Sequence, residues 1–99
     1  MVEHLVLLKL KDGVTPDQKQ AILDGLRGLQ GKLPGIVSIT GGDNNSPEGK
    51  SHGFNWCFKI TFEELAARDA YLPHPDHKAV SAATIHPIAD DVLVLDYCS

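Results

Sequence analysis

Two segments near the two ends of this chain carry apolar side chains on both faces of an expected strand. In residues 4–10, Leu5 and Leu7 point to one face, and the apolar residues between them point to the other. In residues 91–98, four apolar residues follow one another without interruption. A sheet that contains both strands therefore needs a covering layer on each of its faces.

The segment after the first expected strand carries the start signals of a helix. Residues 15–18, Thr-Pro-Asp-Gln, supply an N-cap hydroxyl, a proline at the first helical position and a glutamine at the capping-box position. Pro34 and Gly35 end the helical pattern. The residues expected on the buried face are Ile22, Leu26, Leu29 and Leu33.

Residues 36–40 and 54–62 are predicted to form two further strands joined by a polar loop. The loop, residues 41–53, is rich in Gly, Asp, Asn and Ser, which favour turns. Hairpin connections of variable length are common, so we expect the two strands to form a hairpin. The alternative is that the loop serves as a lid over a binding site.

The strand at residues 54–62 alternates strictly between apolar and polar residues. Its apolar face comprises Phe54, Trp56, Phe58, Ile60 and Phe62. Such a face is usually plain core, but a core beneath helices is also where a small apolar pocket forms. We expect that pocket to be lined by His4, Val6, Leu8, Leu26, Trp56, Phe58, Ile60, His74, Val92 and Val94.

The last third of the chain predicts two short helical stretches before the final strand. Residues 63–72 favour a helix, with an expected stripe of Leu65, Ala66, Asp69 and Leu72. Prolines at positions 73 and 75 then interrupt the helix. Asp76 is the expected N-cap of another helical stretch over residues 77–85, which His86 and Pro87 close.

The order strand, helix, strand, strand, helix, strand is typical of the α+β ferredoxin-like fold, β-α-β-β-α-β, with a four-stranded antiparallel sheet. We expect a single domain over residues 1–99. Its helices cover only one sheet face, and a bare second face would exceed the few hundred Å² of apolar surface, in order of magnitude, that monomers tolerate. The expected cover is a second copy, giving a homodimer in which two sheets form a dimeric α/β barrel.

Charge and composition argue against several classes of partner. The net charge is −4, without the clustered Lys and Arg that nucleic acid requires. No segment approaches the roughly 18 consecutive apolar residues of a membrane span. The first residues do not resemble a secretory signal, and Cys57 and Cys98 fit neither a metal spacing nor a disulfide framework. We therefore expect a cytoplasmic protein with no cofactor, no metal, no nucleic acid and no membrane partner.

The residues best suited to chemistry lie at positions 71–77, Tyr-Leu-Pro-His-Pro-Asp-His. A turn that carries Tyr71, His74 and His77 could aim titratable side chains into a cleft, and histidine titrates nearest to neutral pH. Each of these residues also has a purely structural alternative. His77 would then make only a hydrogen bond at a helix end, and Tyr71 would need only one hydrogen-bond partner. His4 would be a core histidine whose hydrogen bonds are satisfied within the protein. His74 and His77 also present two metal-binding groups, but no third ligand is evident.

Four pieces of the chain, in this order and spacing, resemble the stress-responsive dimeric α/β-barrel (Dabb) family within the dimeric α+β barrel superfamily. They are residues 2–11 (Val-Glu-His-Leu-Val-Leu-Leu-Lys-Leu-Lys), 61–64 (Thr-Phe-Glu-Glu), 71–77, and 95–97 (Leu-Asp-Tyr). The resemblance implies a ferredoxin-like subunit and a tight homodimer.

The resemblance extends to an enzymatic branch of that family, the plant polyketide cyclases, and so implies roles for individual residues. The residue matching His77 acts there as general base, the one matching Tyr71 binds the substrate carbonyl, and the one matching His4 lies in the pocket. Trp56 stands where that branch carries a further pocket histidine, which implies a drier pocket in this chain.

Three classes of function remain open on this sequence. The first is a stress-associated homodimer that binds a small apolar ligand without turnover. The second is a cyclase or other lyase that acts on a small dicarbonyl compound by acid-base chemistry. The third is a structural assembly protein. We favour the first class, with the cyclase-like enzyme next.

Overall fold

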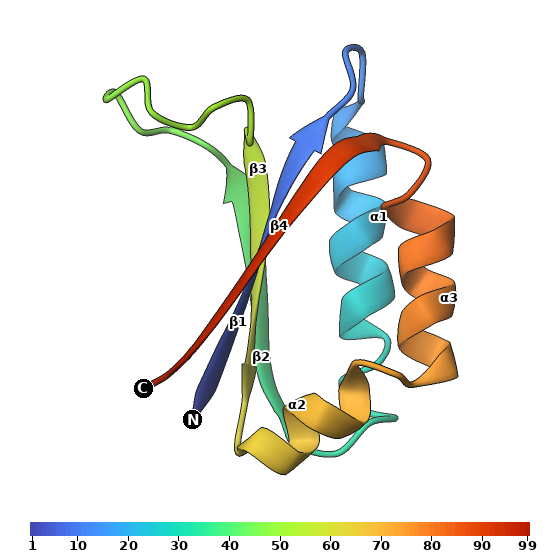
Figure 1. The fold of residues 1–99 in the computed structure, drawn as a ribbon. Coiled ribbons are helices and arrows are strands. Elements are labelled where there is room, and N and C mark those ends of the chain that lie inside the picture. The colour runs from blue at the N-terminus through green and yellow to red at the C-terminus, as the bar shows by residue number, and fades with distance from the viewer.

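Strand β1 lies inside the sheet because both of its edges are paired. The computed structural model describes all of residues 1–99, and the sheet has four antiparallel strands in the order β2-β3-β1-β4. Figure 1 shows α1 and α3 side by side on one face of this sheet, with α2 crossing below its end. The elements in chain order are β1 (Val2–Leu10), α1 (Pro16–Arg27), β2 (Ile36–Asp43), β3 (Trp56–Phe62), α2 (Leu65–Tyr71), α3 (Pro75–Thr84) and β4 (Ala89–Cys98).

The expected ferredoxin-like architecture is confirmed, with one refinement. The helical part between β3 and β4 is divided into α2 and α3, so the order is β-α-β-β-α-α-β. Both helices still lie on the side of the sheet that α1 covers, as Figure 1 shows. The opposite face of the sheet is left without a covering layer.

The core lies between the helices and one sheet face. The alternation expected in the third strand is confirmed from Trp56 to Phe62, where the apolar residues are buried on this side, and the even-numbered residues of β1 join them. Phe54, expected on the same face, lies before β3 and is only half-buried. The expected apolar face of the first helix is also buried. Helix α1 ends at Arg27, however, so Leu29 and Leu33 reach the core from the turns that follow it.

The start of α1 follows the predicted capping box. The Thr15 hydroxyl accepts a hydrogen bond from the Gln18 amide at 3.2 Å, and the Gln18 side-chain oxygen accepts one from the Thr15 amide at 2.9 Å. Pro16 occupies the first turn, where its missing N–H leaves no intrahelical bond unmade.

The hairpin between the second and third strands is confirmed, with shifted ends. Strand β2 continues to Asp43, beyond the expected end at Thr40, and β3 begins at Trp56. Asn44 extends the pairing, since its amide donates to the Asn55 carbonyl at 2.8 Å. The connection between Asn44 and Asn55 is therefore a long hairpin loop.

Two expectations for the α2–α3 region are wrong. The stripe expected to be buried on the second helix is exposed, with Leu65 at 51% and Leu72 at 41%, because α2 crosses the end of the sheet and buries Tyr71 instead. The N-cap of α3 is His74, whose Nδ1 accepts from the Asp76 amide at 3.1 Å. Pro75 holds the residue before it in an extended conformation, which is the backbone geometry of an N-cap.

The sheet face opposite the helices is apolar and open. On β4, Leu93 is 51% exposed and Leu95 65% exposed. Their register partners on β1, Leu7 and Leu5, are only partly covered. We call this surface, formed by Leu5, Leu7, Leu93, Leu95 and Tyr97, the outer face. None of the helices is long and apolar enough to cross a membrane.

Candidate functional site

The fold brings three of the candidate residues together at the end of the sheet where α2 crosses. His4 comes from β1, Tyr71 is the last residue of α2, and His77 lies in the first turns of α3. The ring centroids of Tyr71 and His77 are 4.1 Å apart, and those of His4 and Tyr71 are 6.1 Å apart. Tyr71 and His77 therefore share one site with the histidine of the first strand.

Tyr71 carries a hydroxyl group without a partner. The residue is 2% exposed, and its hydroxyl is the one buried side-chain polar atom in the chain that makes no hydrogen bond. Burial raises the pKa of this phenol well above its ordinary value, so the group stays protonated at neutral pH. A protonated phenol with no internal acceptor is free to donate to a bound molecule.

The ring of His77 is held in one tautomer. Its Nδ1 lies 3.0 Å from the Leu72 carbonyl oxygen, which can only accept, so Nδ1 carries the proton of the neutral ring. The lone pair is therefore on Nε2, which lies 3.4 Å from the Ser81 hydroxyl. Burial lowers the pKa of His77, and the hydrogen bond to Leu72 only partly offsets this. At neutral pH the ring is a neutral base.

His4 is fixed by a carboxylate that the sequence analysis did not single out. Its Nδ1 lies 2.7 Å from Asp96 of β4, and the other oxygen of Asp96 accepts from Arg68 Nη1 at 2.7 Å. Burial alone would raise the pKa of Asp96, but the hydrogen bonds with Arg68 and His4 outweigh it and hold the pKa below its usual value. The only local signal was a carboxylate that follows a run of apolar residues in the last strand.

Apart from His74, which borders a small cavity beside Tyr71, the structure does not place the other expected pocket residues around a common cavity with this site. Trp56 pairs with Leu8 of β1. Leu8 is four residues from His4, so the two positions are about 13 Å apart along the strand at the usual rise per residue. The side chains that fill the core instead of lining a cavity are Val6, Leu8, Leu26, Phe58 and Ile60. Val92 and Val94, on the edge strand β4, are exposed. His74 serves as the α3 cap.

The three main cavities lie in different parts of the molecule. The largest, about 490 Å³, lies on the outer face beneath the β2–β3 loop and includes Trp56 in its wall. A second, about 210 Å³, lies between the start of α1 and the end of β2. The third, about 130 Å³, is bordered by Tyr71 and His74. Of these three cavities, the small third one is the one that borders the titratable site, through Tyr71, and His77 is not part of its lining.

The whole chain, and not only the site, is similar to known proteins. Residues 2–99 match the family described as Stress responsive A/B Barrel Domain. The stress-response A/B barrel domain-containing protein HS1 of Arabidopsis thaliana is 34% identical over 97 residues, which cover 97% of this chain and 87% of that protein. Olivetolic acid cyclase of Cannabis sativa is 29% identical over 76 residues, 77% of this chain and 75% of the cyclase.

A solved structure supports the same grouping. A dimeric ferredoxin-like protein of unknown function from Jannaschia sp. CCS1 superimposes with a TM-score of 0.81 and is 33% identical. The alignment covers 99% of this chain and 98% of that one. Since the family match spans nearly every residue and HS1 is similar over almost its full length, this chain belongs to the stress-responsive A/B barrel domain family.

Proposed function

We propose that this protein is a homodimer that binds a small carbonyl compound at the site formed by Tyr71 and His77. The observation that carries the proposal is the unpartnered hydroxyl of Tyr71. A buried hydroxyl without a partner costs about 1–3 kcal/mol of folding free energy, and a ligand oxygen that accepts its hydrogen bond recovers that cost. A carbonyl oxygen is such an acceptor, and the neighbouring aromatic rings suit a small, largely apolar body.

The homodimer in this proposal is supported by the open outer face and by the relatives. The exposed leucines of β4 form a contiguous apolar surface that a second sheet covers when two copies pack face to face. The similar protein from Jannaschia is described as dimeric. The Tyr71 site lies on the opposite side of the sheet, among the helices, so dimer formation leaves it free to bind a ligand.

A second candidate function is proton transfer on the bound ligand, as in a cyclase or lyase. It is favoured by the tautomer of His77, because a neutral ring with its lone pair on Nε2 can remove a proton from a carbon next to a carbonyl group. Tyr71 would donate a hydrogen bond to the enolate oxygen that develops. The similarity to olivetolic acid cyclase points in the same direction. Trp56, which stands where the resemblance implies a further pocket histidine, pairs with Leu8 and not with His4, so it lies far along the sheet from this site.

Binding is tested with ethyl acetoacetate, a small β-dicarbonyl ester, by isothermal titration calorimetry and by proton NMR of the protein. We expect saturable binding that perturbs the resonances of Tyr71 and His77. Tyr71→Phe, which removes only the hydroxyl, should weaken binding about tenfold or more, as expected for the loss of a hydrogen bond in a water-poor site. Equal binding by the two proteins would rule out the proposed role of the hydroxyl.

Turnover is tested separately by following deuterium exchange at the central carbon of the same ester in D₂O. If His77 acts as a base, His77→Gln should reduce exchange above the buffer background by about 100-fold, the low end of general-base contributions. Asp69→Asn, a change in a largely exposed carboxylate that pairs with Arg68, is the matched control. If the protein binds the ester but deuterium exchange does not exceed the buffer background, the binding proposal stands and the enzymatic proposal is ruled out.

A further inference from the structure

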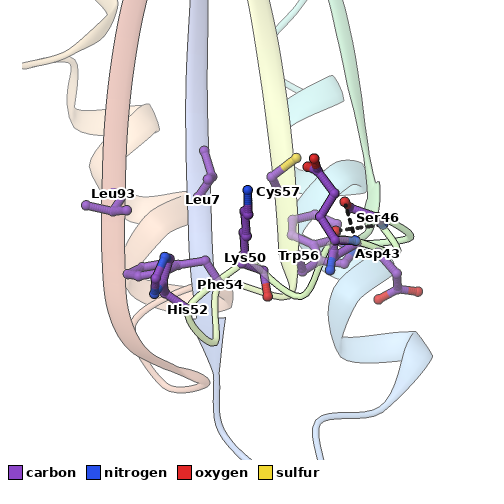
Figure 2. Close-up of a pocket in the computed structure, with 12 residues that line it drawn as sticks. Leu7, Asp43, Ser46, Lys50, His52, Phe54, Trp56, Cys57 and Leu93 are labelled. Carbon is purple, nitrogen blue, oxygen red and sulfur yellow. Dashed lines mark hydrogen bonds between the residues drawn. The ribbon is translucent and has the colours of Figure 1, made fainter.

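The largest hollow of the molecule lies on the outer face, on the opposite side of the sheet from the Tyr71 site. Its volume is about 490 Å³. Leu7, Cys57 and Leu93 come from three adjacent strands and form its floor, since Leu7 is the register partner of both of the others. Figure 2 shows these side chains beside Lys50 and His52, which the β2–β3 loop contributes. The hollow is therefore bounded by the sheet and by its own hairpin loop.

The loop that forms this wall is held in a defined shape. The Asn44 side chain accepts from the Ser46 amide at 3.1 Å, and the Ser46 hydroxyl accepts from the Glu48 amide at 3.3 Å. At the other end, the Phe54 amide donates to the Ser51 carbonyl at 3.0 Å. Figure 1 shows the loop leaning away from α1 and α3, past the sheet.

The floor of the hollow continues into the rest of the outer face. Leu7 and Leu93 are followed along the same two strands by Leu5 and Leu95, which are also register partners. The floor side chains are only partly covered in the single chain, as are those further along the face. A partner that covers the outer face would therefore also cover the floor of the hollow, and it would contact the loop that overhangs this floor.

We infer that the hollow receives a second copy of this chain, and that residues 44–55 form an arm that holds the partner's sheet in the homodimer. The continuity between the floor and the outer face selects this occupant, because one sheet packed on the outer face covers both surfaces at once. The arm borders the hollow on the side of the sheet that the partner covers in the proposed homodimer. This assignment rests on the homodimer proposed above, but it does not depend on the ligand site at Tyr71 and His77.

The cysteine residues allow a direct test in the chain with its loop intact. Cys57 lies in the floor of the hollow, whereas Cys98 is the register partner of Val2 at the far end of β4, and both thiols are free and exposed in the single chain. In a Cys98→Ser background only Cys57 reacts with a maleimide, and in a Cys57→Ser background only Cys98 does. Leu95→Asp, which places a charge in the outer face at a side chain exposed in the single chain, supplies the monomer for comparison.

We expect the rate of Cys57 modification to be about tenfold or more lower in the dimer than in the Leu95→Asp monomer, with oligomeric state measured by sedimentation velocity. The rate for Cys98 should change much less. An equal rate for Cys57 in dimer and monomer would mean that the hollow remains open in the assembly, as a recess for a small molecule, and would overturn the inference.

The arm is tested by deleting residues 47–50, which shortens the loop without touching the paired residues of β2 and β3. The dissociation constant of the dimer should rise about tenfold or more, which is the loss of ~1.4 kcal/mol of interface free energy. Circular dichroism checks that the shortened chain is folded. An unchanged dissociation constant in a folded chain would show that the loop does not hold the partner. If the shortened chain does not fold, the rates of Cys57 modification in dimer and monomer test the inference instead.

Discussion

The Nδ1 atom of His77 lies 3.0 Å from the carbonyl oxygen of Leu72, across a turn that contains two prolines. In a continuous helix the Leu72 carbonyl would accept from the Asp76 amide. That amide instead donates to the His74 side chain, which caps α3, so the carbonyl is left for His77. The prolines that divide α2 from α3 thus also determine which nitrogen of His77 carries the proton.

The lowered pKa of His77 predicts a dependence of stability on pH. Because burial disfavours the charged ring in the folded state, the unfolded chain binds a proton more readily. Stability contributed by the neutral ring is therefore present above the unfolded pKa of about 6.5 and is lost as the pH falls through the lower folded pKa. Urea unfolding at pH 7.5 and at pH 5 should show a decrease that His77→Gln makes smaller.

Two carboxylates with lowered pKa values do not interfere with the comparison of unfolding free energies at pH 7.5 and pH 5. Asp96 and Glu3 both begin to lose stabilising interactions only as the pH falls below the ordinary carboxylate range of about 4. These carboxylates therefore contribute little to the change in stability between pH 7.5 and 5. A pH dependence that is identical in the wild-type chain and in His77→Gln would contradict the burial of the His77 ring.

Tyr71→Phe should separate stability from ligand binding. Its hydroxyl makes no hydrogen bond in the free protein, so removing it relieves an unpaired buried group. We expect the free energy of unfolding to stay unchanged or to rise by about 1 kcal/mol, whereas the affinity for ethyl acetoacetate falls. The check is urea unfolding of both chains without ligand. A loss of stability would show that the hydroxyl already has a partner within the protein.

Gly35 is expected to be intolerant of a side chain, for reasons of backbone and of space. Its φ is +86°, and a Cβ built there would collide with the Cβ of Ala67 in α2. Gly35→Ala should therefore lower the free energy of unfolding by about 1–2 kcal/mol of left-handed strain and by about 1–3 kcal/mol of overpacking. Gly13→Ala is the matched control, because φ is +81° there but no atom lies near the added Cβ. Equal losses at the two positions would rule out the steric contribution.

The sequence predicted those features that local patterns determine. The alternation within the third strand, confirmed for residues 56–62, and the capping box at Thr15, also confirmed, each depend on spacing within a few residues. The need for a second layer followed from the two-faced strands, and the exposure of Leu93 and Leu95 agrees with it. Such patterns carry over to structure because side-chain direction in a strand or helix follows directly from position.

The features that the sequence did not reveal depend on how elements meet. Leu65 and Leu72 have the spacing of a buried helix face, but α2 lies across the end of the sheet, so only one side of this short helix is covered. The contact between Arg68 and Asp96 joins residues 28 positions apart, and no local rule pairs them. The same holds for the hollow on the outer face, whose wall and floor come from separate parts of the chain.

Asp96 is expected to act as a positioning residue for His4. One oxygen of its carboxylate meets His4 Nδ1 and the other meets Arg68 Nη1, each at 2.7 Å. Asp96→Ala leaves a buried imidazole without its partner, so we expect the free energy of unfolding to fall by about 1–3 kcal/mol. Asp69→Ala is the matched control: Asp69 also pairs with Arg68, at 2.8 Å, but is largely exposed and should change stability by less than about 0.5 kcal/mol.

A measurement beyond stability distinguishes positioning from simple support of the fold. In the wild-type chain the carboxylate holds the His4 proton on Nδ1, and ¹⁵N chemical shifts of the ring report this tautomer directly. Asp96→Asn retains the size of the side chain and can still accept from His4, but it loses the charge that attracts Arg68. We expect Asp96→Asn to keep the Nδ1–H tautomer and Asp96→Ala to yield a mixture. If both variants keep the wild-type shifts, Asp96 does not set the His4 tautomer, and its contribution is confined to the ion pair that ties α2 to β4.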